Sequence, residues 1–257
     1  MIMRQDIKDK EFFSRSIKEL EFIEKRSIER HKLGQIPAER IQTSLDLFRS
    51  NSLVKTILHF TFGKPILEVR NEFNNVIKYT NENWVGLWTL KLSADKILNQ
   101  YILSAYDEML WMLSLGYLLD IPNEDFKKLV EVVDRDGVKD YLFEFIIRAK
   151  LKDREPIAEE SYREFFGVPK VFEKLRQAIT EEDKTKAEKL IKEFITKDWY
   201  KNHKEAGWYN SHKSKHDTYF GYWSFETAAV VKIMGLDDSS FIDCQYYPKD
   251  LVHQENI

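Results

Sequence analysis

Apolar residues recur along the chain at the three- and four-residue spacing that is typical of amphipathic helices. In the first eighty residues this spacing predicts three helices, separated by Gly34 with Pro37 and then by Gly63 with Pro65. The first helix is rich in Glu and Lys on its other side, as expected of a solvated outer face. The apolar positions that define the three helices are Phe13, Ile17, Leu20 and Ile23, then Ile41, Leu45, Phe48 and Leu53, then Leu67, Phe73 and Ile77.

The fourth predicted helix differs because it becomes apolar on all sides. Ser93 is its candidate N-cap, since a serine hydroxyl can accept a free amide of the first turn. A helix that is apolar all round is expected at the centre of the fold, with other helices around it. Its apolar positions are Ile97, Leu98, Tyr101, Ile102, Ala105, Met109 and Met112.

Pro122 and Asn123 interrupt the pattern, and Glu124 and Asp125 suit the start of a new helix. We therefore expect an N-terminal helical domain of residues 1–121 and a C-terminal helical domain of residues 122–257. The C-terminal half contains further helical patterns, an exposed charged loop at 150–160 and an exposed polar connection at 201–217. The last well-marked helix contains Phe225 and Ala228 and stops at Gly235.

These helices, with their short connections, predict an all-α fold: an antiparallel multi-helix bundle or stacked helical pairs, in two sub-domains. Only 9 glycines and 6 prolines occur in 257 residues, fewer than the turns of a sheet protein of this size usually need. No alternating strand pattern of convincing length is present. Hydrophobic residues make up 43% of the chain, which is enough for a real core.

Charge and composition reduce the number of possible classes of function. The net charge of −3 lacks the basic footprint of a nucleic-acid binder, so no nucleic-acid partner is expected. Cys244 is the only cysteine, which excludes an internal disulfide and favours a reducing compartment. No signal peptide is apparent, and the longest apolar run is too short for the roughly 20 residues of a membrane span. We expect a cytoplasmic protein without a membrane partner.

Two groups of residues could support catalysis, and each has a structural alternative. His203, His212 and His216 could bind a metal, but the lysines between the last two favour an exposed loop, so no metal or other cofactor is expected. Glu226 could be a buried catalytic acid with a raised pKa, or it could stabilise a helix start. Asp237 and Asp238 could serve a hydrolase together with Glu226, could face a basic partner, or could cap a short helix near Ser239.

Aromatic residues are concentrated between Trp199 and Tyr222. Tyrosine and tryptophan are favoured at protein interfaces because they bury a large area at a small cost in entropy. Interleaved lysines such as Lys201 and Lys213 also fit a weaker nucleic-acid interpretation. About half of these aromatic residues are expected in the core.

The C-terminal segment carries a recognisable pattern. Trp223, Ser224 and Glu226 open an alanine-rich helix, an Asp-Asp-Ser run follows at 237–239, and Tyr-Tyr-Pro-Lys-Asp occupies 246–250. This pattern resembles the C-terminal domain of the PoNi family, the immunity proteins of polymorphic nuclease toxins. The segment 107–116 resembles the N-terminal domain of the same family, and the two together cover most of the chain.

The resemblance implies an α-helical protein without catalytic activity. Such a protein binds and neutralises a cognate DNase toxin delivered between bacteria, often by a type VI secretion system. An inhibitor that covers the basic DNA-binding groove of a nuclease needs acidic and aromatic groups on a preformed surface.

The candidate contacts are Asp153, Glu155, Glu159, Glu160, Tyr209, Tyr219, Asp237 and Asp238. Residues of the family motif are expected to hold the terminal segment in place: Trp223, Ser224, Glu226, Tyr247, Pro248 and Asp250. The oligomeric state stays open, and the runner-up function is a metal-assisted helical hydrolase that uses Glu226 with Asp237 or Asp238.

Overall fold

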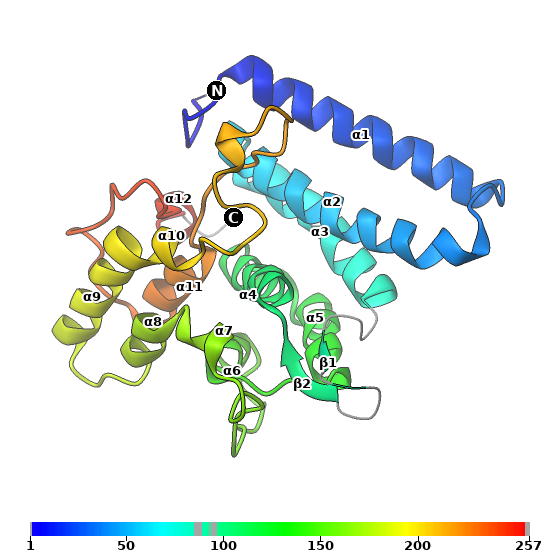
Figure 1. Cartoon of the computed structure of the whole chain (residues 1–257). Coiled ribbons are helices and arrows are strands. Elements are labelled where there is room, and N and C mark those ends of the chain that lie inside the picture. Colours follow the sequence, from blue (N-terminus) through cyan, green and yellow to red (C-terminus); the bar gives the residue numbers. More distant parts are fainter. Residues whose placement is uncertain (1, 85–88, 92, 94–96, 255–257) are drawn as a thin grey trace. The chain divides into compact units, whose positions relative to one another are not determined.

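The structure is a computed structural model that describes residues 2–84, 89–91, 93 and 97–254 (Figure 1). It confirms the predicted all-α fold class. The chain divides into two compact units. Unit 1 comprises Met1–Val85 together with Asn210–Gly221, and unit 2 comprises Gly86–Tyr209 together with Tyr222–Ile257.

Unit 1 is built from three long helices, α1 (Lys10–Lys32), α2 (Ile41–Phe62) and α3 (Ile66–Asn83), with a short 3-10 turn, η1 (Ala38–Arg40), before α2. The Asp9 carboxylate caps α1 by accepting the Phe12 amide at 2.8 Å. Gly63 ends α2 in the left-handed conformation, and a Cβ there would lie 1.9 Å from the Ile2 carbonyl oxygen. This position therefore requires glycine.

A buried lysine joins the three helices of unit 1. Lys55 on α2 forms ion pairs with Glu24 on α1 and with Glu72 on α3, the latter at 3.0 Å. Burial alone would lower the pKa of Lys55, but the hydrogen bonds and charges of the two glutamates raise it above its ordinary value. The lysine therefore stays charged and holds three helices at one point.

The segment Asn210–Gly221, which we call the return segment, packs into unit 1 although it follows most of unit 2 in the sequence. It contains a short 3-10 turn, η3 (Ser211–Lys213). The hydroxyl of Tyr219 donates to Gln5 Oε1 at 2.7 Å, and Thr61 Oγ1 donates to the Phe220 carbonyl at 2.8 Å. The tyrosine ring also packs against Phe12 and Phe13.

The centre of unit 2 is α4 (Leu103–Leu118), in which 12 of 16 residues are buried. It packs against α5 (Asn123–Arg135), α6 (Tyr141–Lys150) and α11 (Phe225–Met234) (Figure 1). This confirms the predicted central helix. The other helices of the unit are α7 (Gly167–Lys170), α8 (Glu173–Ala178), α9 (Lys184–Glu193), the π-helical turn η2 (Phe194–Asp198), α10 (Trp199–Asn202) and α12 (Lys249–Val252).

The predicted start of the central helix was wrong. Residues Ile97–Tyr101 form strand β2, which pairs antiparallel with β1 (Thr89–Lys91), and Ser93 lies in an exposed bend. Residues 94–96 of the expected helix lie outside the described residues. The amide of Tyr101 donates to the Tyr162 hydroxyl at 2.9 Å, so a distant side chain fixes the extended backbone at the end of β2.

Candidate partner-binding surface

The charged loop predicted near 150–160 runs from residue 151 to 166, between α6 and α7 (Figure 1). We call residues 151–166 the acidic loop, because it contains five acidic and three basic residues. Its backbone is tied to the body of unit 2 at Ser161, whose amide donates to the Lys139 carbonyl and whose hydroxyl accepts the Lys139 amide, both at 2.8 Å. The loop is therefore held at its middle as well as at its ends.

Arg176 on α8 fixes one side of the acidic loop. Its guanidinium donates to the buried carboxylate of Asp140 at 2.9 Å and also pairs with Glu160 of the loop. Asp140 in turn caps α6 by accepting the amides of Leu142 and Phe143 at 2.9 and 3.0 Å. The start of α6 and the loop are thus joined through one charge-assisted network.

Arg154, within the loop, fixes the other side. It donates to Asp134 at the end of α5 at 2.7 and 2.9 Å, and to Glu144 on α6 at 2.5 to 3.1 Å. Hydrogen bonds to these two carboxylates raise the pKa of Arg154 further above its already high value. Paired arginine–carboxylate contacts of this kind restrict geometry more than single contacts do. They make the loop a preformed surface.

The four acidic contacts predicted on this loop have different environments. Asp153 and Glu155 are exposed, and no ion pair joins either of them to the rest of the described chain. Glu159 is exposed and pairs with Arg163 at 2.8 Å. Glu160 is half-buried, where it pairs with Arg176 and accepts the Tyr141 amide at 2.9 Å. Asp153, Glu155 and Glu159 are therefore available to a partner, whereas Glu160 mainly orders the loop.

Sequence reasoning missed the exposed aromatic residues beside these acids. Tyr141, at the start of α6, and Phe165 and Phe166, at the end of the loop, are each more than 40% exposed. A rule that assigns aromatic residues to the core would not find them. The available signal was the position of Tyr141, Phe165 and Phe166 in or next to the charged segment of the sequence.

The two predicted tyrosine contacts lie in different settings. Tyr209 is half-buried, and its ring packs on Tyr200 at 4.6 Å between centroids. Tyr219 is only 1% exposed, in the core of unit 1. Its ring packs against Phe12 and Phe13, so it does not form part of a binding surface.

The two acids predicted as contacts in the C-terminal segment also lie in different environments. Asp237 is exposed, and its carboxylate accepts the Ser239 amide at 2.9 Å, which lowers the pKa of Asp237. It caps a turn instead of the short helix considered from the sequence. Asp238 is 5% exposed and accepts the Tyr247 hydroxyl and His253 Nε2, each at 2.7 Å. Asp238 therefore holds the terminal segment and is not available to a partner.

The family-motif residues are mostly interior. Trp223, Ser224, Glu226, Tyr247 and Pro248 are buried, whereas Asp250 is exposed. This placement supports the expected structural role for the first five.

Glu226 lies at the centre of a buried polar cluster in unit 2. Its Oε1 accepts Trp199 Nε1–H at 2.6 Å and the Ser224 hydroxyl at 2.7 Å. Burial raises the pKa of Glu226 to about 7, although the hydrogen bond from Ser224 and the nearby His203 oppose the shift. The raised pKa considered from the sequence is present, but the side chain has no exposed surface through which a substrate could reach it.

The same cluster contains a histidine–aspartate pair that the sequence did not suggest. His203 Nε2 lies 3.4 Å from Asp107 on α4, and Nδ1–H donates to the Trp199 carbonyl at 2.6 Å. Burial is the largest effect and lowers the pKa of His203. The charge and hydrogen bond of Asp107, the Trp199 carbonyl and the charge of Glu226 together outweigh burial, so the net shift is upward. Trp208 Nε1 also donates to Asp107, at 3.3 Å. The pair joins α4 to the residue that follows α10. His203 is buried, so the prediction that 201–217 is exposed fails at this position.

The hydrolase alternative finds little support in this geometry. His203 belongs to unit 2, whereas His212 and His216 belong to the return segment of unit 1. Within the described residues, no three His, Cys, Asp or Glu side chains are placed to hold a metal ion. Glu226 and Asp238 are both buried in separate hydrogen-bond networks, and Asp237 lies on an exposed turn.

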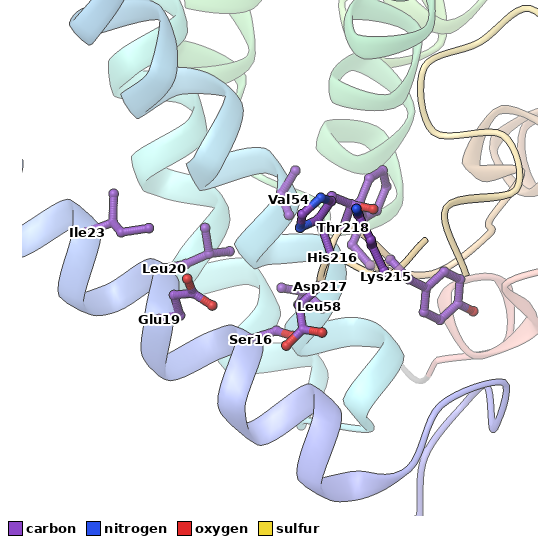
Figure 2. Close-up of a pocket in the computed structure, with 12 residues that line it drawn as sticks. Ser16, Glu19, Leu20, Ile23, Val54, Leu58, Lys215, His216, Asp217 and Thr218 are labelled. Atoms are coloured by element: carbon purple, nitrogen blue, oxygen red, sulfur yellow. The ribbon is translucent and has the colours of Figure 1, made fainter. Parts of the chain in front are cut away.

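Unit 1 contains a pocket of about 650 Å³ between α1, α2 and the return segment. Figure 2 shows Leu20 and Ile23 of α1 and Val54 of α2 at this pocket, with His216 on the opposing segment. Its walls carry Glu19 and Asp217 as well as Lys215 and His216. Because both signs of charge are present, the pocket has no preference for a strongly basic protein. Among the described helices, none is long and apolar enough to cross a membrane.

Fold and surface together define an all-α protein with a rigidly held acidic loop. Two family models match the chain in succession: "PoNe immunity protein (PoNi), N-terminal" over residues 4–131 and "PoNe immunity proteins (PoNi), C-terminal" over residues 138–251. The chain belongs to the PoNi family of immunity proteins, whose partners are polymorphic nuclease toxins. The first match ends at residue 131 and the second begins at 138, both beyond the boundary expected at 121/122, and the compact units divide elsewhere again.

One solved structure, "The Crystal Structure of Protein PA2201 from Pseudomonas aeruginosa", is similar in fold. The TM-score is 0.67 at 18% sequence identity, covering 97% of this chain and 89% of that chain. At this identity the similarity supports the fold alone. No curated protein matches the chain.

Proposed function

We propose that this protein neutralises one cognate DNase toxin in the cytoplasm by forming a stoichiometric complex that covers the DNA-binding surface of the nuclease. The toxin would be delivered by a neighbouring cell, with type VI secretion as the expected route. The observation that carries the proposal is the acidic loop, which the ion pairs of Arg154 and Arg176 fix to the body of unit 2. The fixed loop presents Asp153, Glu155 and Glu159 as exposed acids.

A nuclease presents a basic groove to the phosphates of DNA. Acidic groups on an inhibitor accelerate the encounter with such a groove and reject partners of the wrong charge. Asp153, Glu155 and Glu159 are exposed on the acidic loop and supply this charge. Because the loop is already ordered, little conformational entropy is lost on binding. Tight binding matters here, since a few free toxin molecules would degrade the chromosome.

The other predicted contacts take lesser roles in this proposal. Glu160 positions the loop through Arg176, and Tyr209 and Asp237 are secondary candidates at the surface of unit 2. The buried Tyr219 and Asp238 have structural roles, as do the interior residues of the family motif. No metal, cofactor or catalytic residue is required.

We expect the gene of the cognate nuclease to lie next to the gene of this protein, and the test uses the product of that gene. Titration calorimetry with a catalytically inactive form of that nuclease should give a 1:1 complex, and co-expression should protect cells from the active form. Absence of binding, together with continued killing on co-expression, would contradict the proposal.

Charge-neutral variants locate the surface. The double substitution Asp153→Asn with Glu155→Gln should slow association, and it should also reduce the dependence of the association rate on salt. The matched control is Glu29→Gln with Glu39→Gln, which removes two exposed charges from unit 1. Equal effects of the two double substitutions would argue against the acidic loop as the contact.

A further inference from the structure

Three exposed aromatic side chains lie beside the acidic loop. Tyr141 and Phe165 are each 44% exposed, and Phe166 is 43% exposed. Exposing large aromatic surface to water is unfavourable, and a group of such residues often marks an interaction site. All three lie in or next to the acidic loop, which distinguishes them from single apolar residues scattered over a surface.

The ion pair between Glu160 and Arg176 fixes this aromatic group. The Tyr141 amide donates to Glu160, and its hydroxyl lies 3.5 Å from the Ala158 carbonyl oxygen in the same loop. The guanidinium of Arg176 lies over the ring of Phe166, 5.2 Å from its centroid. Phe165 precedes Phe166 in the chain. The rings therefore belong to one ordered part of unit 2.

The most exposed aromatic residue of unit 1 offers a contrast. Phe22 on α1 is 63% exposed, in a groove that Lys10, Arg15 and Lys18 also line. Glu11 and Glu19 also line this groove, and Arg15 is paired with Asp217. The charges there are balanced and give no attraction for a basic partner. Phe165 and Phe166 instead share the acidic loop with Asp153, Glu155 and Glu159, and Tyr141 is hydrogen-bonded to that loop.

We infer that Tyr141, Phe165 and Phe166 form the apolar centre of the interface with the basic nuclease toxin, and that the exposed acids of the acidic loop belong to the same interface. The inference rests on the proposed function and adds the residues that hold the complex together. Aromatic residues at the centre of an interface commonly supply most of its binding energy, while charges at the rim govern encounter. The two sets should therefore control different rate constants.

The experiment measures association and dissociation rates for the full-length protein and the inactive cognate nuclease by surface plasmon resonance. Phe165→Ala with Phe166→Ala should raise the dissociation rate by about 30-fold or more, as expected for central interface residues. The association rate and its salt dependence should change little. Tyr141→Ala should act in the same direction. The control is Phe22→Ala, which removes an exposed ring of unit 1 and should leave both rates unchanged.

The outcomes are distinguishable. If the wild-type protein binds the nuclease and the double alanine variant dissociates at the wild-type rate, the inference is wrong while the proposed function stands. If the wild type self-associates in ultracentrifugation, and the variant becomes monomeric but keeps its nuclease affinity, the rings contact a second copy and the inference is again wrong. If the wild type does not bind the nuclease at all, the proposed function fails first and the inference fails with it.

Discussion

The carboxyl group of Glu226 illustrates how a single residue can look catalytic and yet be structural. Its Oε1 accepts two hydrogen bonds, whereas Oε2 is buried and has no hydrogen-bond partner among the described residues. A charged oxygen without a partner in a dry environment is unfavourable, which is why the pKa rises to about 7. Below about pH 7, the folded protein therefore prefers the protonated acid.

This preference predicts a pH dependence of stability. The pKa of Glu226 is about 7 in the folded state and 4.5 ordinarily, so the folded state binds the extra proton between these values. Its contribution to stability is complete below pH 4.5 and is lost as the pH rises to 7, by roughly 3 kcal/mol at most. Glu226→Gln cannot ionise and should flatten the decline in the free energy of unfolding between pH 5 and 8, measured by urea denaturation.

The control for this prediction is Glu182→Gln, at an exposed position, which should keep the wild-type pH profile. A Glu226→Gln profile parallel to that of the wild type would show that another group causes the decline. His203 is the alternative, because its pKa is also raised and its contribution is likewise lost as the pH increases.

Lys55 is a buried charged residue whose partners the helical pattern of the sequence does not reveal. A lysine at an inward position of α2 contradicts the amphipathic pattern unless acids from other helices meet it. Glu24 and Glu72 do so, from α1 and α3. The side chain of Lys55 is 7% exposed, so its loss leaves two glutamates facing each other with little solvent.

Lys55→Met should therefore destabilise the protein by about 3 kcal/mol or more, the usual cost of removing one partner of a buried ion pair. Adding Glu24→Gln and Glu72→Gln should recover most of that loss, because the variant then has no uncompensated charge. Lys64→Met is the control, since Lys64 and Glu68 form an exposed pair that should contribute less than about 1 kcal/mol. Chemical denaturation of the three variants measures these differences, and a triple variant no better than Lys55→Met would refute the explanation.

At the scale of elements, the sequence predicted the long helices well and the short ones poorly. The spacing of Phe13, Ile17 and Leu20 marks α1 because a long helix repeats its pattern over several turns. Residues 97–101 combine apolar and polar positions that fit either a strand or one helical turn. A five-residue segment is too short for periodicity to decide, and the contact from Tyr162 lies 61 positions away.

The candidate surface was only partly predictable for the same reason. The charged loop and its exposed acids follow from composition, since a run of charges without apolar spacing is usually solvated. The burial of Tyr219 and Asp238 depends on Gln5 and His253, which the local pattern does not connect to them. Exposure of Tyr141, Phe165 and Phe166 likewise depends on which neighbours the fold supplies.

The two compact units of the molecule do not coincide with the N-terminal and C-terminal halves of the sequence. The chain passes between the compact units at 85/86, again at 209/210, and again at 221/222. Unit 1 is therefore incomplete without the return segment, and unit 2 contains α4 as well as the C-terminal family motif. A boundary at 121/122 remains our expectation from the sequence alone, but it would separate α4 from α6 and α11, on which α4 packs.

This organisation predicts how fragments behave. A fragment of residues 1–121 keeps the mostly buried helix α4 but lacks its partners α6 and α11. It also lacks Tyr219 to cover Phe12 and Phe13. A fragment of residues 122–257 lacks α4 and with it Asp107, the partner of the buried His203. Neither fragment should show a cooperative thermal transition by circular dichroism, whereas co-expression of both should yield a soluble complex.

The matched control is the intact chain, which should melt cooperatively under the same conditions. A cooperative transition in either fragment by itself would mean that the halves are autonomous domains, because a unit that depends on residues from both sides of the cut cannot fold without them.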